Sequence, residues 1–184
     1  MKKLLTLIAV IGAMTAPAKA QEQKAQPFLG LEVSRSNIGM NYLANTVVAD
    51  NYYSASIQAG VKMQKKIPVA VSLFYQKAKE EKAATTGLKT DFKAAGLDST
   101  YYFPVGDALS LTANLGLGYY SFNCSDLGYS EDKIGVRMGA GLEYSLSDNF
   151  AVQSTFRYTD LNFGSDGDVA KDMTEVSVGV KFYF

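Results

Sequence analysis

Histidine and tryptophan are absent from this 184-residue sequence, and cysteine occurs only once, at Cys124. Without histidine, the side chain that most often serves as general base in hydrolases is missing. Without histidine or a second cysteine, the usual ligands of a zinc site are missing as well. We therefore expect no catalytic residue, no metal site and no cofactor, although a Ser–Lys or carboxylate-only arrangement stays open.

A single cysteine cannot form a disulfide within the chain. Cys124 stands among polar residues, Asn123, Ser125 and Asp126, which predicts a loop position without a chemical role. A second candidate for metal chemistry is an acidic segment that contains Asp160, Asp166, Asp168 and Asp172. It lacks the ligand spacing and closing glutamate of an EF-hand loop, so a solvated acidic loop is the prediction.

Neither sign of charge is in excess, since basic and acidic side chains each number 18. No basic excess is therefore present that would indicate nucleic acid as a partner. Beyond residue 20 the sequence also lacks an apolar run of the roughly 20 residues that a membrane helix needs. A transmembrane β-barrel is not excluded, because each of its strands shows lipid only every second residue.

The N-terminal stretch has the three parts of a secretory signal peptide. Two lysines precede an apolar core over residues 4–14, and the small-residue site Ala18-Lys19-Ala20 follows. We expect Sec-type export, cleavage of residues 1–20, and one mature domain over residues 21–184.

Apolar residues alternate with polar or small ones over much of the chain, most clearly at the C-terminal end. The apolar side chains there are Val176, Val178, Val180, Phe182 and Phe184. A period of two is that of a β-strand with one face in an apolar medium and the other face in a polar medium.

Eight segments alternate in this way, and most have the roughly 9 to 11 residues that a tilted membrane strand needs. They cover residues 28–36, 54–64, 69–77, 91–103, 109–120, 133–146, 150–158 and 174–184. Long and short connections alternate between them, as expected when hairpin turns lie at one end of a barrel and loops at the other. The long connections are residues 37–53, 78–90, 123–132 and 162–172.

Aromatic residues gather near the ends of these segments, which predicts two interfacial girdles. Those near the short turns are Phe28, Phe103, Phe150, Phe182 and Phe184, and those near the long loops are Tyr75, Tyr119 and Tyr158.

The predicted fold is all-β, an eight-stranded antiparallel transmembrane up-and-down β-barrel. In a soluble barrel, such as a lipocalin-like binder, the interior row would be apolar and the exterior row polar. Here one row carries almost every large aliphatic residue, and the other carries glycine, serine, threonine, glutamine and charge. The apolar row is therefore expected to face lipid.

Charged residues on the inward row are the candidate site of the barrel. They are Glu32, Lys62, Asp98, Arg137, Glu143, Arg157, Glu175 and Lys181, with Lys133 at the rim. By position along the strands, Glu32, Lys62, Glu143 and Lys181 are expected at the short-turn end. Because the bore of an eight-stranded barrel is only wide enough for side chains to fill, we expect opposite charges to pair there and plug the lumen. A proton or ion route along the same residues is the alternative.

Residues 139–150, Gly-Ala-Gly-Leu-Glu-Tyr-Ser-Leu-Ser-Asp-Asn-Phe, and residues 156–160, Phe-Arg-Tyr-Thr-Asp, carry a family resemblance. They resemble a hairpin and the strand after it in the small bacterial outer-membrane β-barrel proteins, which include opacity-type surface proteins, the OmpA membrane domain and the OmpX/Ail group. The resemblance implies the Gram-negative outer membrane and an assembly signal at Phe184 and Phe182, read by the barrel assembly machinery. We expect no peptidoglycan-binding domain of the OmpA type, so the resemblance does not imply cell-wall tethering.

Three hypotheses for function follow. The first is a non-enzymatic surface protein, a monomer in contact with outer-membrane lipid and lipopolysaccharide, that contributes to envelope integrity. Its long loops would then present residues for adhesion or contact with a host or surface ligand, first among them the tyrosine-containing loop 37–53. The second hypothesis is a narrow porin for small solutes, and the third is a lipid-modifying enzyme.

Overall fold

The computed structural model describes residues 25–40, 49, 51–64, 68–83, 86–161 and 170–184. Within this part of the chain the regular elements are nine β-strands. They are β1 (Ala25–Met40), β2 (Asn51–Met63), β3 (Val69–Ala78), β4 (Glu81–Lys82), β5 (Lys89–Pro104), β6 (Leu109–Cys124), β7 (Tyr129–Ser147), β8 (Phe150–Asp160) and β9 (Ala170–Tyr183). No helix in the described residues is long and apolar enough to cross a membrane.

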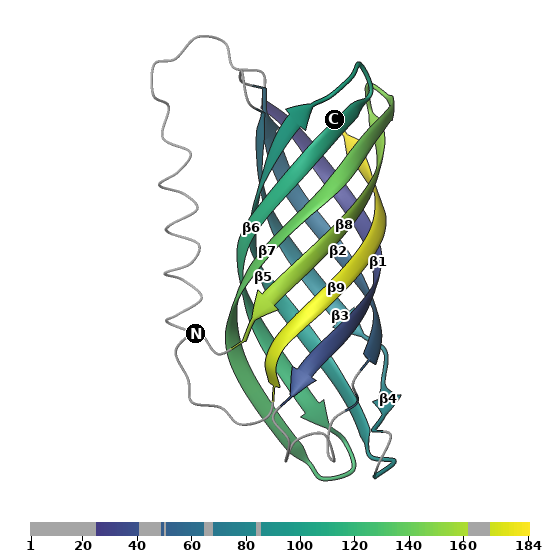
Figure 1. Cartoon of the computed structure of the whole chain (residues 1–184), viewed down its shortest axis with the longest axis vertical. Helices are drawn as coiled ribbons and strands as arrows, with labels where there is room; N and C mark the ends of the chain where they lie inside the picture. The colour runs from purple at the N-terminus through teal and green to yellow at the C-terminus, as the bar shows by residue number, and fades with distance from the viewer. Residues whose placement is uncertain (1–24, 41–48, 50, 65–67, 84–85, 162–169) are drawn as a thin grey trace.

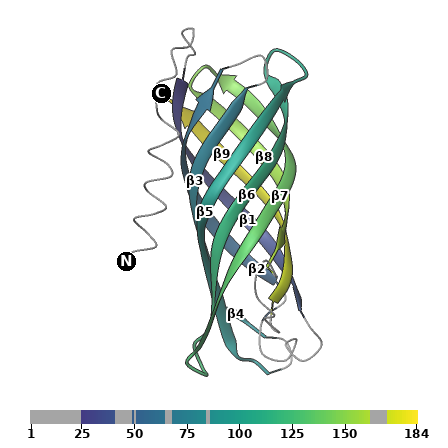
Figure 2. The same cartoon turned by 90° about the vertical axis from the view of Figure 1, so that its left-hand side faces the viewer.

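Eight of the strands close into an antiparallel barrel, which confirms the predicted fold. Neighbours in sequence pair from β1 to β3 and from β5 to β9, and the β3–β5 and β1–β9 pairings complete the ring. Figures 1 and 2 show the strands tilted around a tall cylinder, with the C-terminus at the end that carries the short turns. The predicted closing strand thus joins the two ends of the sheet and leaves no open edge.

The alternation of apolar and polar residues in the sequence corresponds to the alternation of outward and inward side chains in the barrel wall. Along β9, Val176 and Val178 are more than half exposed, whereas the intervening Ser177 is buried in the bore. Leu31 on β1 is 60% exposed, and Glu32 beside it is 3% exposed. The outer surface is thus a band of aliphatic side chains, which is stable only against the hydrocarbon of a membrane.

Several strands run further toward the long loops than predicted, and this overturns the expected position of Cys124. Cys124 is the last residue of β6 and is buried in the bore, so it does not lie in a loop. The outer row at this level holds Ser121 and Asn123, since it has left the apolar band. The strand continues past that band, and the apolar alternation used to find it stops earlier.

The predicted long connections shrink for the same reason. Strands now include residues 37–40, 51–53, 78, 89–90, 123–124, 129–132 and 170–172 of the predicted loops. The two-residue strand β4 lies inside the predicted loop 78–90. β4 pairs with the start of β5 and leaves the closed ring unchanged. The expected signal peptide 1–20 lies outside the described residues.

One residue of the predicted short-turn girdle faces the other way. Phe28 is 3% exposed and packs in the bore against the ring of Tyr183, at a centroid distance of 5.6 Å. It falls on the inward row together with Glu32, four residues later, so the period of two places it inside. Phe182 and Phe184 do face outward, at 47% and 63% exposure.

Candidate functional site

The charged row of the bore is held in place by the strand pleat and by small neighbours. Glycines on the inward row leave the space that long side chains need. A Cβ atom on Gly179 would lie 2.6 Å from Cγ of Glu32, and one on Gly139 would lie 3.0 Å from Cγ of Arg157. Glycine at these positions therefore makes room for ionic side chains that cross the bore.

Arg157 is the centre of the middle layer. Its Nη2 lies 2.7 Å from Glu32 Oε1, and its Nη1 lies 2.8 Å from Glu175 Oε1. Nη1 also donates to Ser177 Oγ at 3.0 Å. All three charged side chains are at most 4% exposed, so this is one buried triad with one guanidinium between two carboxylates.

Neutral donors saturate the remaining carboxylate oxygens of this triad. Glu175 Oε2 accepts hydrogen bonds from Ser34 and Ser36, both at 3.2 Å, and from the Gln76 amide. Glu32 accepts from Gln153 and, at 3.3 Å, from Ser56 Oγ. Buried carboxylates need such donors because their loss of water is otherwise uncompensated.

A second pair occupies the other side of the middle layer. Arg137 Nη2 lies 2.8 Å from Asp98 Oδ2, and both side chains are about 5% exposed or less. The Arg137 guanidinium also stacks over the ring of Phe74, 3.9 Å from its centroid. Asp98 Oδ1 and Arg137 Nε have no protein partner among the described residues.

The short-turn end is organised around Glu143. Lys62 Nζ and Lys181 Nζ lie 3.1 Å and 2.9 Å from its two carboxylate oxygens, and the Tyr183 hydroxyl donates to it at 2.9 Å. Lys62 also lies over the ring of Tyr102, 3.9 Å from its centroid. One carboxylate, two ammonium groups and two phenols thus fill this end of the bore.

All eight predicted site residues therefore point into the bore, and the structure groups them into two layers. Glu32 is the one that the sequence placed in the wrong group. It pairs with Arg157 in the middle layer, not with the lysines at the short-turn end. Lys133 lies at the long-loop end, with Glu131 at 3.3 Å and the Ala170 carbonyl at 3.0 Å.

The sequence reasoning missed the apolar clusters that cover both charged layers. At the long-loop end the bore contains a cluster of buried apolar residues. Its larger members are Ile38, Tyr52, Phe74, Phe92, Tyr120, Phe122, Leu161 and Met173. Tyr52 packs edge-on against Phe92, and its hydroxyl lies 2.6 Å from Thr90 Oγ1. At the other end Phe28, Tyr102 and Tyr183 form a smaller cluster. The sequence does contain a pattern that indicates the long-loop cluster, because the inward residues of β5 and β6 become aromatic beyond the membrane band.

Metal ligands do not gather in the described part of the chain, where no group of three or more His, Cys, Asp or Glu side chains could hold an ion. Asp160 and Asp172 are direct partners in the β8–β9 ladder. Asp166 and Asp168 of the predicted acidic loop lie outside the described residues.

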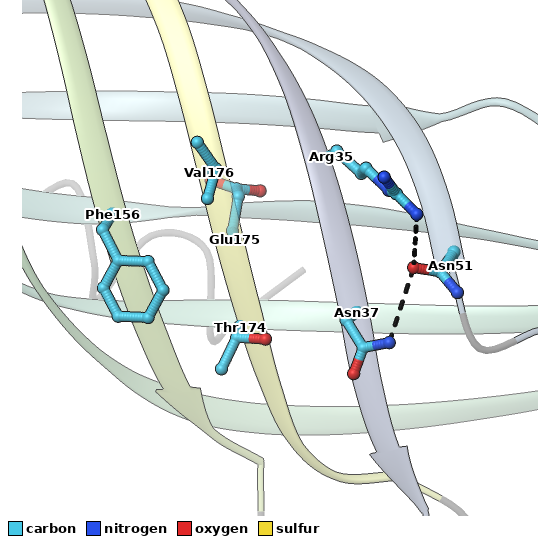
Figure 3. A pocket seen from close by; sticks show the side chains of 7 residues that line it. All are labelled: Arg35, Asn37, Asn51, Phe156, Thr174, Glu175 and Val176. Atoms are coloured by element: carbon cyan, nitrogen blue, oxygen red, sulfur yellow. Dashed lines mark hydrogen bonds between the residues drawn. The ribbon is translucent and has the colours of Figure 1, made fainter.

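The outer wall carries a groove of about 210 Å³ near the long-loop end, lined by residues of β1, β2, β8 and β9. Figure 3 shows Arg35, Asn37 and Asn51 along one side and Phe156 on the other. Both Arg35 Nη2 and Asn37 Nδ2 donate to Asn51 Oδ1, each at 3.4 Å. The groove is therefore polar on one wall and apolar on the other.

The family and fold comparisons agree with this architecture. The outer membrane protein beta-barrel domain family matches residues 6–184. Ail, the attachment invasion locus protein of Yersinia pestis, was crystallised with the heparin analogue sucrose octasulfate. It superimposes with a TM-score of 0.57 and 20% identity over 89% of this chain and 100% of that chain.

Two further crystal structures share the fold. Neisserial surface protein A has a TM-score of 0.59 and 16% identity over 88% of this chain and all of that one. The N-terminal β-barrel domain of Pseudomonas aeruginosa OprF has a TM-score of 0.55 and 18% identity over 88% of this chain and all of that one. No curated protein sequence matches. The chain belongs to the outer membrane protein β-barrel family, and its location is the outer membrane of a Gram-negative bacterium.

Proposed function

We propose that this protein is a non-enzymatic outer-membrane barrel with a closed lumen, which contributes to envelope integrity and presents its long-loop end for adhesion or host contact. The observation that carries the closed lumen is the pairing of charge in the bore. Among the described inward side chains, five cations and five carboxylates form six ion pairs. No excess of either sign is left to attract one kind of ion.

The physics of a narrow barrel supports closure. Eight strands leave a bore that side chains can fill. A solute that passed through would have to break the buried pairs, and each uncompensated buried charge costs several kcal/mol. The aromatic side chains of the clusters at the two ends add bulk that narrows the bore further.

The surface role rests on geometry and on fold likeness. The strand ends that the long connections join lie at one end of the barrel, which is the outer end in bacterial barrels. Ail is described as an attachment invasion protein, and a similar role for this chain is part of the proposal. The absence of histidine supports a non-enzymatic function, because the usual general base is lacking.

Planar-bilayer recording tests closure. The refolded protein should give no sustained open-channel current, whereas a general porin inserted under the same conditions should. A stable conductance that scales with the amount of inserted barrel would replace this proposal with the narrow porin. Binding of whole cells to a panel of matrix proteins, with each long loop exchanged in turn, tests adhesion separately.

The assembly role expected for the last residues is also part of the proposal. Phe182 and Phe184 stack edge to face at 5.1 Å on the outer wall. The Phe184 backbone N–H donates to the Pro27 carbonyl at 2.9 Å, so it extends the seam between β9 and β1. An exposed aromatic pair beside the closing seam is a surface that an assembly machine can bind before the ring closes.

A further inference from the structure

Two pairs of like charges stand on the outer wall at the long-loop end of the apolar band. Lys77 and Lys93 are direct partners in the β3–β5 ladder, and Asp160 and Asp172 are direct partners in the β8–β9 ladder. We call them the lysine pair and the aspartate pair. Both lysines are exposed, and both aspartates are partly exposed on the outward row. Like charges directly opposite on one face of a sheet are unfavourable, so each pair is stabilised by a group of opposite charge.

The chain itself offers the lysine pair no such group. In the part of the chain that the structure describes, neither lysine forms an ion pair. Two acidic side chains close to them in sequence are already engaged. Glu80 pairs with Lys89 at 3.3 Å, and Asp91 accepts a hydrogen bond from Asn123 Nδ2 at 3.0 Å.

The carboxylate of Asp172 is held by a neutral donor. It accepts a hydrogen bond from the Tyr158 hydroxyl, which leaves its negative charge in place. Lys171 is exposed beside it and forms no ion pair among the described residues. Asp172 can therefore still interact with a cation from outside the chain.

The two pairs lie on opposite sides of the barrel. Around the ring, β6 and β7 separate the β3–β5 ladder from the β8–β9 ladder in one direction, and β1 and β2 separate them in the other. With two strands between them either way, the lysine pair and the aspartate pair point in opposite directions from the barrel axis.

The register places both pairs at the same depth. Following direct ladder partners once around the ring leads from one end to the other of residues 29–39 on β1, ten residues nearer the long loops. The ladder thus climbs about four residues over the three steps from β5 to β8. It leads from Lys93 to Asp132 on β7, whereas the β7 partner of Asp160 is Val136, four residues nearer the short turns. The climb is offset, so Asp160 lies level with Lys93.

We propose that copies of this barrel associate side by side in the membrane, with the lysine pair of one copy against the aspartate pair of the next. In two parallel copies at equal depth, Lys93 then faces Asp160 and Lys77 faces Asp172. The apolar walls do not select the partner, because lipid is as apolar as they are. The opposite charges beyond the apolar band select it.

The expected assembly is an open row. The contact joins two different surfaces of the same chain, and such head-to-tail contacts close into a ring only if each step adds a rotation. Here the two surfaces point in opposite directions, so each added copy continues the line. The proposal departs from the monomer expected from the sequence, and it does not depend on the closed lumen.

Energy transfer between labelled barrels in phosphatidylcholine vesicles measures the association. The dye is attached at Gly106→Cys in a short turn, where a new side chain meets no atom within 4 Å, in a Cys124→Ser background. Donor-labelled and acceptor-labelled barrels are mixed at a fixed surface density. An unrelated eight-stranded barrel, labelled in the same way, gives the baseline for random encounters.

Charge reversal at each pair tests the pairing. K77E/K93E carries acidic pairs on both sides, and D160K/D172K carries basic pairs on both sides. Each variant alone should associate about tenfold more weakly than the wild type, and high salt should weaken the wild type in the same direction. A mixture of the two variants should recover the wild-type association, because each then meets the opposite charge.

A second lysine pair supplies the matched control. Lys82 and Lys89 are also direct ladder partners, on β4 and β5, but they lie further from the apolar band. K82E/K89E should therefore associate like the wild type. Unboiled gel mobility verifies that every variant is folded.

Three results would overturn the proposal: baseline transfer by the wild type, an equal loss in K82E/K89E and K77E/K93E, or no recovery in the mixture. If a reversed variant does not fold, carbodiimide cross-linking of the wild type decides. The reagent condenses a lysine with an aspartate into an amide, and a link between Lys93 and Asp160 can form only between two copies because these residues lie on opposite sides of one barrel. Recovery of that link by mass spectrometry supports the row, and cross-linked dimers that lack any link between the two pairs refute it.

Discussion

The Arg157 triad allows one quantitative prediction about the bore. Arg157→Met removes the guanidinium that lies 2.7 Å from Glu32 and 2.8 Å from Glu175. Both carboxylates then stay buried with only neutral donors. Breaking a buried pair by removing one partner costs about 3 to 5 kcal/mol. Because two carboxylates lose one shared partner, we expect the free energy of unfolding to fall by about 5 kcal/mol, the upper end of that range.

A matched variant separates charge from packing. Arg157→Met combined with Glu32→Gln and Glu175→Gln removes the whole triad and leaves neutral side chains of similar size. Replacing a complete buried ionic group is often close to neutral in stability. The triple variant should therefore recover most of the loss and lie within about 2 kcal/mol of the wild type.

Urea unfolding of barrels refolded into lipid vesicles gives the measurement. Since tryptophan is absent, far-UV circular dichroism and the gel mobility of unboiled samples are the two probes. The midpoint should fall in Arg157→Met while the slope stays unchanged, as expected for a change in stability alone. A loss below about 1 kcal/mol in the single variant, or an equal loss in the triple variant, would refute the argument that these charges are dry and mutually compensated.

Three further predictions concern packing, closure and assembly. Gly179→Ala should lower the free energy of unfolding by about 1 to 3 kcal/mol through overpacking, whereas Gly30→Ala should be tolerated because its new Cβ would lie 3.4 Å or more from its neighbours; urea midpoints of both variants decide this. Phe92→Ala combined with Phe122→Ala removes two rings from the long-loop end and should raise single-channel conductance if the apolar cluster contributes to closure. Closed traces identical to those of the wild type would assign closure to the charged layers alone. Deletion of Phe184 should lower the amount of barrel in outer-membrane fractions without preventing refolding in detergent, and normal membrane levels would contradict an assembly signal there.

The course of the barrel wall could be predicted from the sequence because lipid and bore impose opposite chemistry on alternate residues. That contrast exists only within the thickness of the membrane. Past it, the outer row of β6 becomes Ser121 and Asn123 while the inner row keeps Phe122 and Cys124. An alternation rule tuned to an apolar outer face therefore ends each strand too early, and it assigned Cys124 to a loop.

The partners inside the bore could be named as a group but not as pairs. Which inward residues meet depends on the stagger between strands, and that is a property of the closed ring. Glu32 stands opposite Gly179, which in turn stands opposite Gln153, while Arg157 stands opposite Glu175. The Arg157 side chain reaches Glu32 diagonally across this ladder. The position of Glu32 along β1 alone predicted that it would lie near the short turns and pair with a charge there.

The ion pairs that cross the bore have a structural role that the hydrogen bonds between neighbouring strands cannot perform. Hydrogen bonds between neighbouring strands fix the spacing around the wall but leave its cross-section free to flatten. Lys62 on β2 and Glu143 on β7 come from opposite sides of the ring, four strands apart in either direction, and meet at 3.1 Å. A tie of this kind sets the diameter directly. Since buried ion pairs add little net stability compared with apolar packing, we infer that their contribution here is to fix one cross-section, and a fixed cross-section is what the closed lumen proposed above requires.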